Sequence, residues 1–187
     1  MEPNQIVQSN QGHLEIVPIG PVDRMAISIL AANLQAIMGL NTDIGGEQPK
    51  PEYAYLPGRS QYDADKIINI LAVAEEDTRF KLGVTQYDLC TPILTYVFGE
   101  SQLGGKVALI SLYRLKDPDM DRAYLRSVKI GIHEVGHLMG IGHCREPDCL
   151  MRFSSNLEKL DQLPLKLCDA CEYEVVRHVR ALSNPVD

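Results

Sequence analysis

Three features that would point to particular partners are missing from this chain of 187 residues. No apolar run approaches the roughly 18 residues that a membrane-spanning helix needs. Acidic residues outnumber basic ones by 25 to 18, for a net charge of −7, so the chain lacks the broad basic surface with which proteins bind nucleic acid. The first twenty residues contain no basic segment followed by an apolar stretch, which predicts that there is no secretory signal and that the protein is cytoplasmic.

The length predicts a single domain spanning residues 1–187, with an α+β fold built on a mixed sheet. Repeats and low-complexity segments are absent, and helices alternate with strands in the first two thirds of the chain. Helices are expected over residues 22–38 and 63–78. Strands are expected at His13–Ile19 and over residues 82–89, 94–98 and 107–113, with a short strand near 53–56 inside a loop rich in glycine and proline.

A long helix is predicted from Asp117, with that residue as the N-cap and Pro118 at the first helical position, to a point near Gly140. Its apolar residues recur at intervals of three and four, which predicts that one side of the helix is buried. These residues are Leu125, Val128, Ile132, Val135 and Met139. The stretch 141–167 has no clear periodicity, and a last helix is expected over residues 169–182.

The long helix carries a short motif of two histidines and a glutamate, His133-Glu134-Val135-Gly136-His137. Residues four apart on an α-helix differ by only about 40° around its axis, so both imidazoles can reach one metal ion. Glu134 is displaced from His133 by about 100°, which places it beside a water molecule on that ion and not on the ion itself. A carboxylate there can accept a proton from the water and later donate it to a leaving amine.

His143 completes a three-histidine pattern only if the chain leaves the helix after His137, because six further helical residues would turn it away from the ion. Gly140 permits the bend, since glycine adopts positive φ angles without strain, and Gly142 adds freedom. Three neutral imidazoles would hold a catalytic zinc ion and leave one position open. The alternative is a chance occurrence of HExxH in a core helix, which gives Gly140 and His143 no role.

Four of the five cysteines follow the histidines closely, as the pairs Cys144/Cys149 and Cys168/Cys171. Two close pairs separated by a loop are typical of a closed, structural zinc site with four thiolate ligands. Because Cys144 directly follows the last histidine, this second ion would also hold that histidine in place. Disulfides and redox chemistry at the CxxC are the alternatives, and the expected cytoplasmic location disfavours the first of them. Cys90 lies apart, at a strand end, and is expected to be a small buried residue.

The string HEVGHLMGIGH followed by Met151 resembles the metzincin zinc metalloproteases, and with the cysteine pattern it is similar to the archaemetzincins in particular. The resemblance covers residues 133–171. It implies that the three histidines bind the catalytic zinc, that the four cysteines bind a second zinc, that Glu134 is the general base, and that Met151 lies in a tight turn beneath the catalytic ion. Some metzincins place a tyrosine ligand two residues after this methionine, but Phe153 stands there, so no ligand is assigned to it.

The resemblance also implies a fold and a way of binding substrate. A twisted mixed sheet with two packed helices and the active-site helix would form residues 1–140, and a zinc-stapled subdomain with the final helix would form residues 141–187. Peptide would add as an extra strand along an exposed sheet edge, with residues near 150–156 lining a pocket beside the zinc. The edge residues expected to bind it are Leu94, Thr95, Tyr96, Val97 and Phe98, which could also form an ordinary sheet strand.

These patterns lead to one main hypothesis, a zinc-dependent metallopeptidase that acts as a monomer on peptides or proteins with two zinc ions per chain. The competing hypothesis is a zinc-organised peptide-binding module that is catalytically silent or is opened only by a partner. The enzyme is favoured because Glu134 has no structural reason to stand where it does. A four-cysteine nucleic-acid-binding finger is a weaker alternative, since the chain is acidic.

Overall fold

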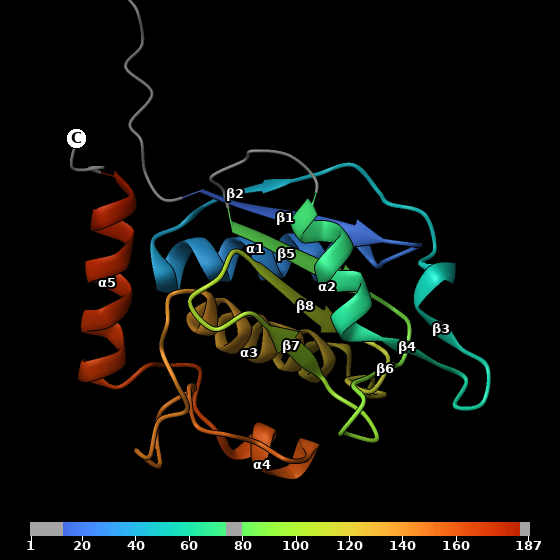
Figure 1. Ribbon diagram of the computed structural model, residues 1–187. Coiled ribbons are helices and arrows are strands. Elements are labelled where there is room, and N and C mark those ends of the chain that lie inside the picture. The colour runs from blue at the N-terminus through green and yellow to red at the C-terminus, as the bar shows by residue number, and fades with distance from the viewer. Residues whose placement is uncertain (1–12, 74–79, 184–187) are drawn as a thin grey trace, which may run out of the picture.

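In the computed structural model, which describes residues 13–73 and 80–183, a five-stranded sheet forms the centre of the molecule (Figure 1). Its strands lie in the order β2–β1–β5–β8–β7. The first four are parallel, and β7 at one edge runs antiparallel to β8. In that order the strands are Asn41–Ile44, His13–Ile19, Phe80–Thr85, Val107–Ser111 and Gly99–Ser101. The three central strands are mostly buried because helices cover both faces, as is usual for parallel strands.

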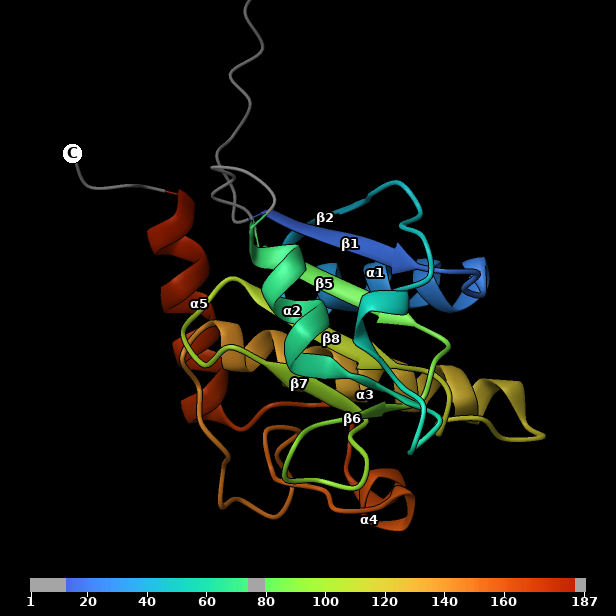
Figure 2. The ribbon, with the colours of Figure 1, turned by 45° about the vertical axis from the view of Figure 1, so that its right-hand side comes forward.

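Helices pack on both faces of this sheet. α1 (Arg24–Met38) and α3 (Met120–Leu138) lie side by side on one face, and the shorter α2 (Ala64–Val73) lies on the other (Figures 1 and 2). The larger hydrophobic cluster fills the space between the sheet and the pair α1 and α3, and a smaller cluster lies beneath α2. No helix among the described residues is both long enough and apolar enough to cross a membrane.

The first strand and the first helix lie close to the boundaries predicted from the sequence. The strand expected at His13–Ile19 is confirmed, and the helix expected over 22–38 starts only two residues late. Asp23 caps α1 by accepting a hydrogen bond from the backbone N–H of Met25. Gly39 ends the helix with a φ of 68°, which a residue with a side chain rarely adopts.

α3 is the long helix that the sequence predicts, but its N-cap is Asp119 and not Asp117. Asp117 instead forms an ion pair at 3.1 Å with Arg126, one of the few charged side chains that are buried. The prediction that Leu125 is buried is also wrong, because this side chain is 40% exposed. At that turn of the helix the inward position belongs to Arg126, whose guanidinium donates to the backbone carbonyl of Leu115.

The strand predicted over residues 94–98 is wrong. The segment has one isolated bridge, at Val97, and no strand ladder. Its carbonyls are bound by a side chain instead, because the guanidinium of Arg59 donates to the backbone oxygens of Leu94 and Thr95, both at 2.8 Å. The strand at this edge of the main sheet is therefore the next segment, β7.

Other boundaries in this half of the chain also differ from those predicted. The strand expected over 82–89 is divided into β5 and β6 (Leu89–Cys90), and Cys90 is fully buried, as expected. β6 forms a second, small sheet with β4 (Gln61–Asp63) and β3 (Tyr55–Leu56), which follow the 3-10 helix η1 (Glu52–Ala54). The helix expected over 63–78 is described as far as Val73, and its last residues lie outside the described part.

Two helices complete the C-terminal part, α4 (Leu157–Gln162) and α5 (Asp169–Ser183). The second was predicted. The first was not, because six residues are too few to give a periodic pattern. α3 holds α4 through an ion pair at 2.7 Å between Arg126 and Asp161, and through a hydrogen bond at 2.9 Å from the Nζ of Lys129 to the carbonyl of Leu160.

Candidate metal centres and active-site cleft

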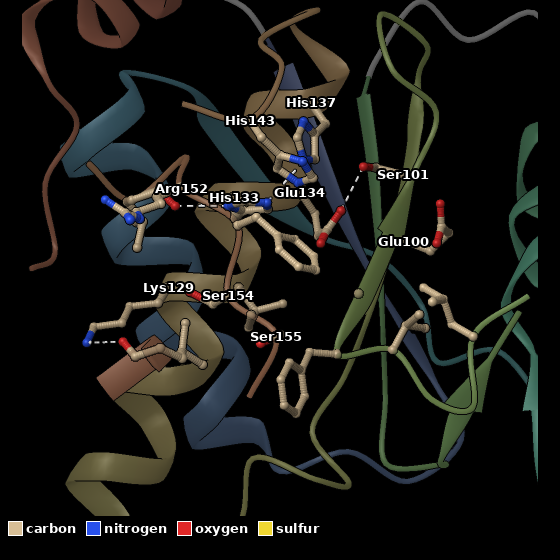
Figure 3. A pocket seen from close by; sticks show the side chains of 18 of the residues that line it. Glu100, Ser101, Lys129, His133, Glu134, His137, His143, Arg152, Ser154 and Ser155 are labelled. Atoms are coloured by element: carbon tan, nitrogen blue, oxygen red, sulfur yellow. Dashed lines mark hydrogen bonds between the residues drawn. The ribbon is translucent and has the colours of Figure 1, made fainter. Parts of the chain in front are cut away.

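α3 presents two histidines on one face, and a third follows the end of the helix. His133 and His137 lie one turn apart, and their Nε2 atoms are separated by 3.0 Å. Beyond the helix, Gly140 adopts a φ of 76°, the left-handed bend that the sequence predicts. This bend brings His143 back to the other two rings (Figure 3), and one ring nitrogen of each histidine lies within 4.8 Å of the others. The structure therefore brings together the three histidines of the motif.

Backbone carbonyls orient two of the three rings. The Nδ1 of His133 donates to the carbonyl of Leu150 at 2.9 Å, and that of His137 donates to the carbonyl of Ile141 at 2.7 Å. A carbonyl can only accept, so both Nδ1 atoms carry the proton and both Nε2 atoms keep a lone pair. Burial lowers the pKa of His133 to about 4 and also lowers the pKa of His137. Both rings are therefore neutral at pH 7, the form that binds metal.

The donor atoms fit a zinc ion. Two Nε2 atoms that both lack a proton cannot hydrogen-bond to each other, yet those of His133 and His137 stand 3.0 Å apart. Tetrahedral ligands at the usual Zn–N distance of about 2.0–2.1 Å would be separated by about 3.3 Å, which is close to that value. His143 is exposed and the other two are half-buried, so the cluster is open on one side, as a catalytic zinc site must be.

Glu134 lies beside the histidines but is not part of their cluster. Its side chain points from α3 toward β7, where the hydroxyl of Ser101 donates to Oε2 at 2.7 Å (Figure 3). Burial raises the pKa of Glu134 to about 8. The hydrogen bond from Ser101 opposes this rise, and the charge of Glu100 adds to it. A buried carboxyl group next to a candidate metal site is suited to proton transfer.

Met151 packs against the helix that carries the histidines. It is fully buried, and its Sδ would lie 2.5 Å from a Cβ placed on Gly136, so the absence of a side chain there lets the two elements touch. Its carbonyl accepts a hydrogen bond at 2.9 Å from the backbone N–H of Cys144. The preceding residue, Leu150, supplies the carbonyl that orients His133. Met151 therefore joins the segment after Cys144 to the helix that carries His133 and His137.

The four C-terminal cysteines form a second cluster. Their Sγ atoms all lie within 4.8 Å of one another, those of Cys144 and Cys168 are 3.8 Å apart, and none is in a disulfide. Thiolates at the usual Zn–S distance of about 2.3 Å in a tetrahedron would also be about 3.8 Å apart. Burial raises the pKa of the Cys149 and Cys171 thiols, so a bound cation would have to displace their protons. The cluster fits a closed zinc site that has no position for substrate.

A cleft of about 590 Å³ runs past the histidines and Glu134. Residues 94–98, from which substrate binding is expected, line one wall and lead directly into β7. Residues 152–155, which fall in the segment expected beside the zinc, line another part. Several further lining residues could not be found from the sequence, because their positions depend on contacts between distant segments. They include Ser101, Lys129, Leu160 and Leu163.

The chain is similar to known proteins over most of its length. The model of peptidase family M54 matches residues 53–177. An archaemetzincin from Methanocaldococcus jannaschii is 34% identical over 162 residues, which cover 83% of this chain and 88% of the relative. The crystal structure of archaemetzincin from Methanopyrus kandleri matches with a TM-score of 0.84 and 31% identity, over 94% of this chain and 99% of that one. A zinc-dependent peptidase from Methanocorpusculum labreanum matches with a TM-score of 0.79 and 28% identity, over 87% and 99%. The α+β fold expected from the sequence is confirmed.

Proposed function

Because the chain belongs to peptidase family M54 and to the archaemetzincins, it is a zinc metallopeptidase, and we propose that Glu134 is its general base and general acid. The observation that carries the proposal is the position of this carboxyl group, which is buried in the cleft next to the three-histidine cluster. The other acidic residue that lines the cleft, Glu100, lies on the far side of β7 and points away from the histidines (Figure 3).

The residues of the site have two different roles, zinc binding and proton transfer. We assign His133, His137 and His143 as ligands of the catalytic zinc. A zinc ion held by them would supply a Lewis acid for the carbonyl of the scissile bond and for the attacking water. Glu134 accepts the proton that the attacking water gives up. It then donates that proton to the leaving nitrogen, so the amine departs as a neutral group.

Substrate binding is assigned to the wall of the cleft that precedes and includes β7. The residues proposed to contact peptide are Leu94, Thr95, Tyr96, Val97 and Phe98, the set expected from the sequence. Among the strands of residues 13–73 and 80–183, β7 pairs with β8 alone in the main sheet, so its other edge can offer backbone groups to an extended peptide lying in the cleft. Peptides or proteins are the substrates that the family implies.

A second zinc ion is assigned to Cys144, Cys149, Cys168 and Cys171, which gives two ions per chain. Its role is structural, because four thiolates leave no coordination position for substrate or water. We infer that it holds the described residues 141–183 together as a subdomain, and that it fixes the segment that carries His143 and the Leu150 carbonyl.

The variant Glu134→Gln tests the mechanism. We expect it to retain the zinc content of the wild type and to lose hydrolysis of a varied peptide set by about 10²-fold or more, the usual contribution of a general acid–base group. Glu47→Gln, which changes an exposed glutamate in the loop after β2, is the matched control and should hydrolyse peptides like the wild type. Undiminished turnover by Glu134→Gln in a preparation free of other proteases would refute the assignment. A zinc-loaded wild type that binds peptides without hydrolysing them would support the binding-module hypothesis instead.

A further inference from the structure

Two residues of the edge strand β7 face the carboxyl group of Glu134. Side chains alternate along a strand, so Gly99 and Ser101 share one face while Glu100 lies on the other. The shared face is turned toward α3 (Figure 3). β7 is held by an antiparallel ladder to the fully buried strand β8, with Gly99 opposite Ile110, so this face is a fixed surface.

Gly99 provides the space that the Glu134 side chain occupies. A Cβ at position 99 would lie 2.6 Å from Cγ, 2.8 Å from Oε1 and 2.9 Å from Cδ of Glu134, all shorter than real contacts of a Cβ. The backbone of Gly99 is not in the left-handed region, so any residue could adopt its conformation. Glycine is therefore needed here for its lack of a side chain, and the group that would be displaced is the proposed general base.

Ser101 supplies the hydrogen bond that fixes the same carboxyl group. Its hydroxyl donates to Oε2 at 2.7 Å, and Glu134 itself is only 7% exposed. A hydrogen bond of this length holds Oε2 in one position and so restricts the rotation of the carboxyl group. The Ser101 hydroxyl binds Oε2 and not Oε1, so the second carboxylate oxygen does not accept this hydrogen bond.

We propose that Gly99 and Ser101 are positioning residues for catalysis: together they form a cradle on β7 that holds the Glu134 carboxyl group in its working orientation. The inference rests on the proposed role of Glu134. In this arrangement the edge strand has two separate roles. Its free backbone edge is available to the peptide. Two of its residues, Gly99 and Ser101, hold the carboxyl group of the general base in position.

Three variants of the zinc-loaded enzyme test the cradle. Ser101→Ala should lower kcat by about 10- to 100-fold, the equivalent of one hydrogen bond to a charged group, and change KM by less than about twofold. Ser101→Thr keeps the hydroxyl and should restore most of kcat. Gly99→Ala should lower kcat by about 10²-fold, the loss associated with a displacement of about 1 Å. Ser28→Ala and Gly46→Ala are the controls, because the Ser28 hydroxyl bonds within α1 and a Cβ at Gly46 meets nothing within 4 Å.

Three further measurements separate positioning from a general loss of structure. Zinc content should stay at the wild-type value in Ser101→Ala and Gly99→Ala, and a crystal structure of Gly99→Ala should show the Glu134 carboxyl group displaced. Combined with Glu134→Gln, the change Ser101→Ala should cause no further loss, because it acts through the residue already altered. If Glu134→Gln is inactive while Ser101→Ala and Gly99→Ala both retain wild-type kcat, the cradle is refuted and the mechanism stands. If Glu134→Gln is fully active, the mechanism itself has failed.

Discussion

Loss of one thiolate ligand should destabilise the fold by an amount that follows from the loop that the cysteine cluster closes. An ion held by Cys149 and Cys168 closes a loop of about 20 residues. The chain-entropy relation for cross-links gives about 3 kcal/mol for a loop of that size. In a chain of this length each kcal/mol shifts Tm by about 2–4 °C, so Cys168→Ser should lower Tm by roughly 6–12 °C.

The Cys168→Ser change should also lower the zinc affinity of the three-histidine site, although it alters none of the three histidines. The carbonyl that orients His133 belongs to Leu150, which directly follows Cys149, and Cys144 directly follows His143. Loss of partners that orient metal ligands typically costs about 10- to 100-fold in metal affinity. We therefore expect Cys168→Ser to need a higher concentration of free zinc for full activity.

Elemental analysis and thermal unfolding would measure both effects. The wild type should bind two zinc ions per chain and Cys168→Ser one. Unfolding is best followed by circular dichroism, since the chain has no tryptophan. Cys90→Ala is the control for zinc content, because it removes a cysteine that lies outside the cluster. Two tightly bound ions in Cys168→Ser, together with an unchanged Tm, would refute the assignment of the cluster as a zinc site.

Three further predictions concern packing, pH and the substrate-binding wall. Met151→Ala should lower the free energy of unfolding by about 2–5 kcal/mol because the side chain is fully buried, and a loss below 1 kcal/mol in urea titrations would contradict that packing. Arg126 lowers the pKa of Asp161, so their pair stabilises the fold above the ordinary aspartate pKa of about 3.9, and this stabilisation is lost as the pH falls through the lowered pKa. The stability difference between wild type and Asp161→Asn should therefore shrink below about pH 4, and a constant difference would be inconsistent with the pair. Arg59→Gln should speed hydrogen exchange across residues 94–98 and raise KM more than it lowers kcat, whereas unchanged exchange would show that the guanidinium does not hold this wall.

The metal-binding candidates could be predicted because their geometry is local. The separation of His133 from His137 fixes their relation on any α-helix, and Gly140 is the one residue in the following turn that adopts a positive φ without strain. To predict the cysteine cluster, it was enough to see that two close pairs of cysteines are joined by a loop. For these residues the spacing along the chain already determines the chemistry.

The walls of the cleft could not be predicted in the same way, because distant residues determine them. The shape of the 94–98 segment depends on Arg59, which lies 35 positions before Leu94 in the chain. The position of α4 depends on Arg126 and Lys129, which reach it across more than 30 residues. Ser101 likewise meets Glu134 from 33 positions away. No local pattern of apolar and polar residues records such contacts.

The short stretch from Cys144 to Met151 carries an unusual constraint on its length. Loops on protein surfaces generally tolerate inserted or deleted residues. Here the first residue is a candidate thiolate ligand and the last packs under the helix, with the Leu150 carbonyl on the His133 ring just before it. Adding or removing one residue would move at least one of these groups off its partner. In evolution or in engineering, this loop should therefore accept changes of side chain far more readily than changes in the number of its residues.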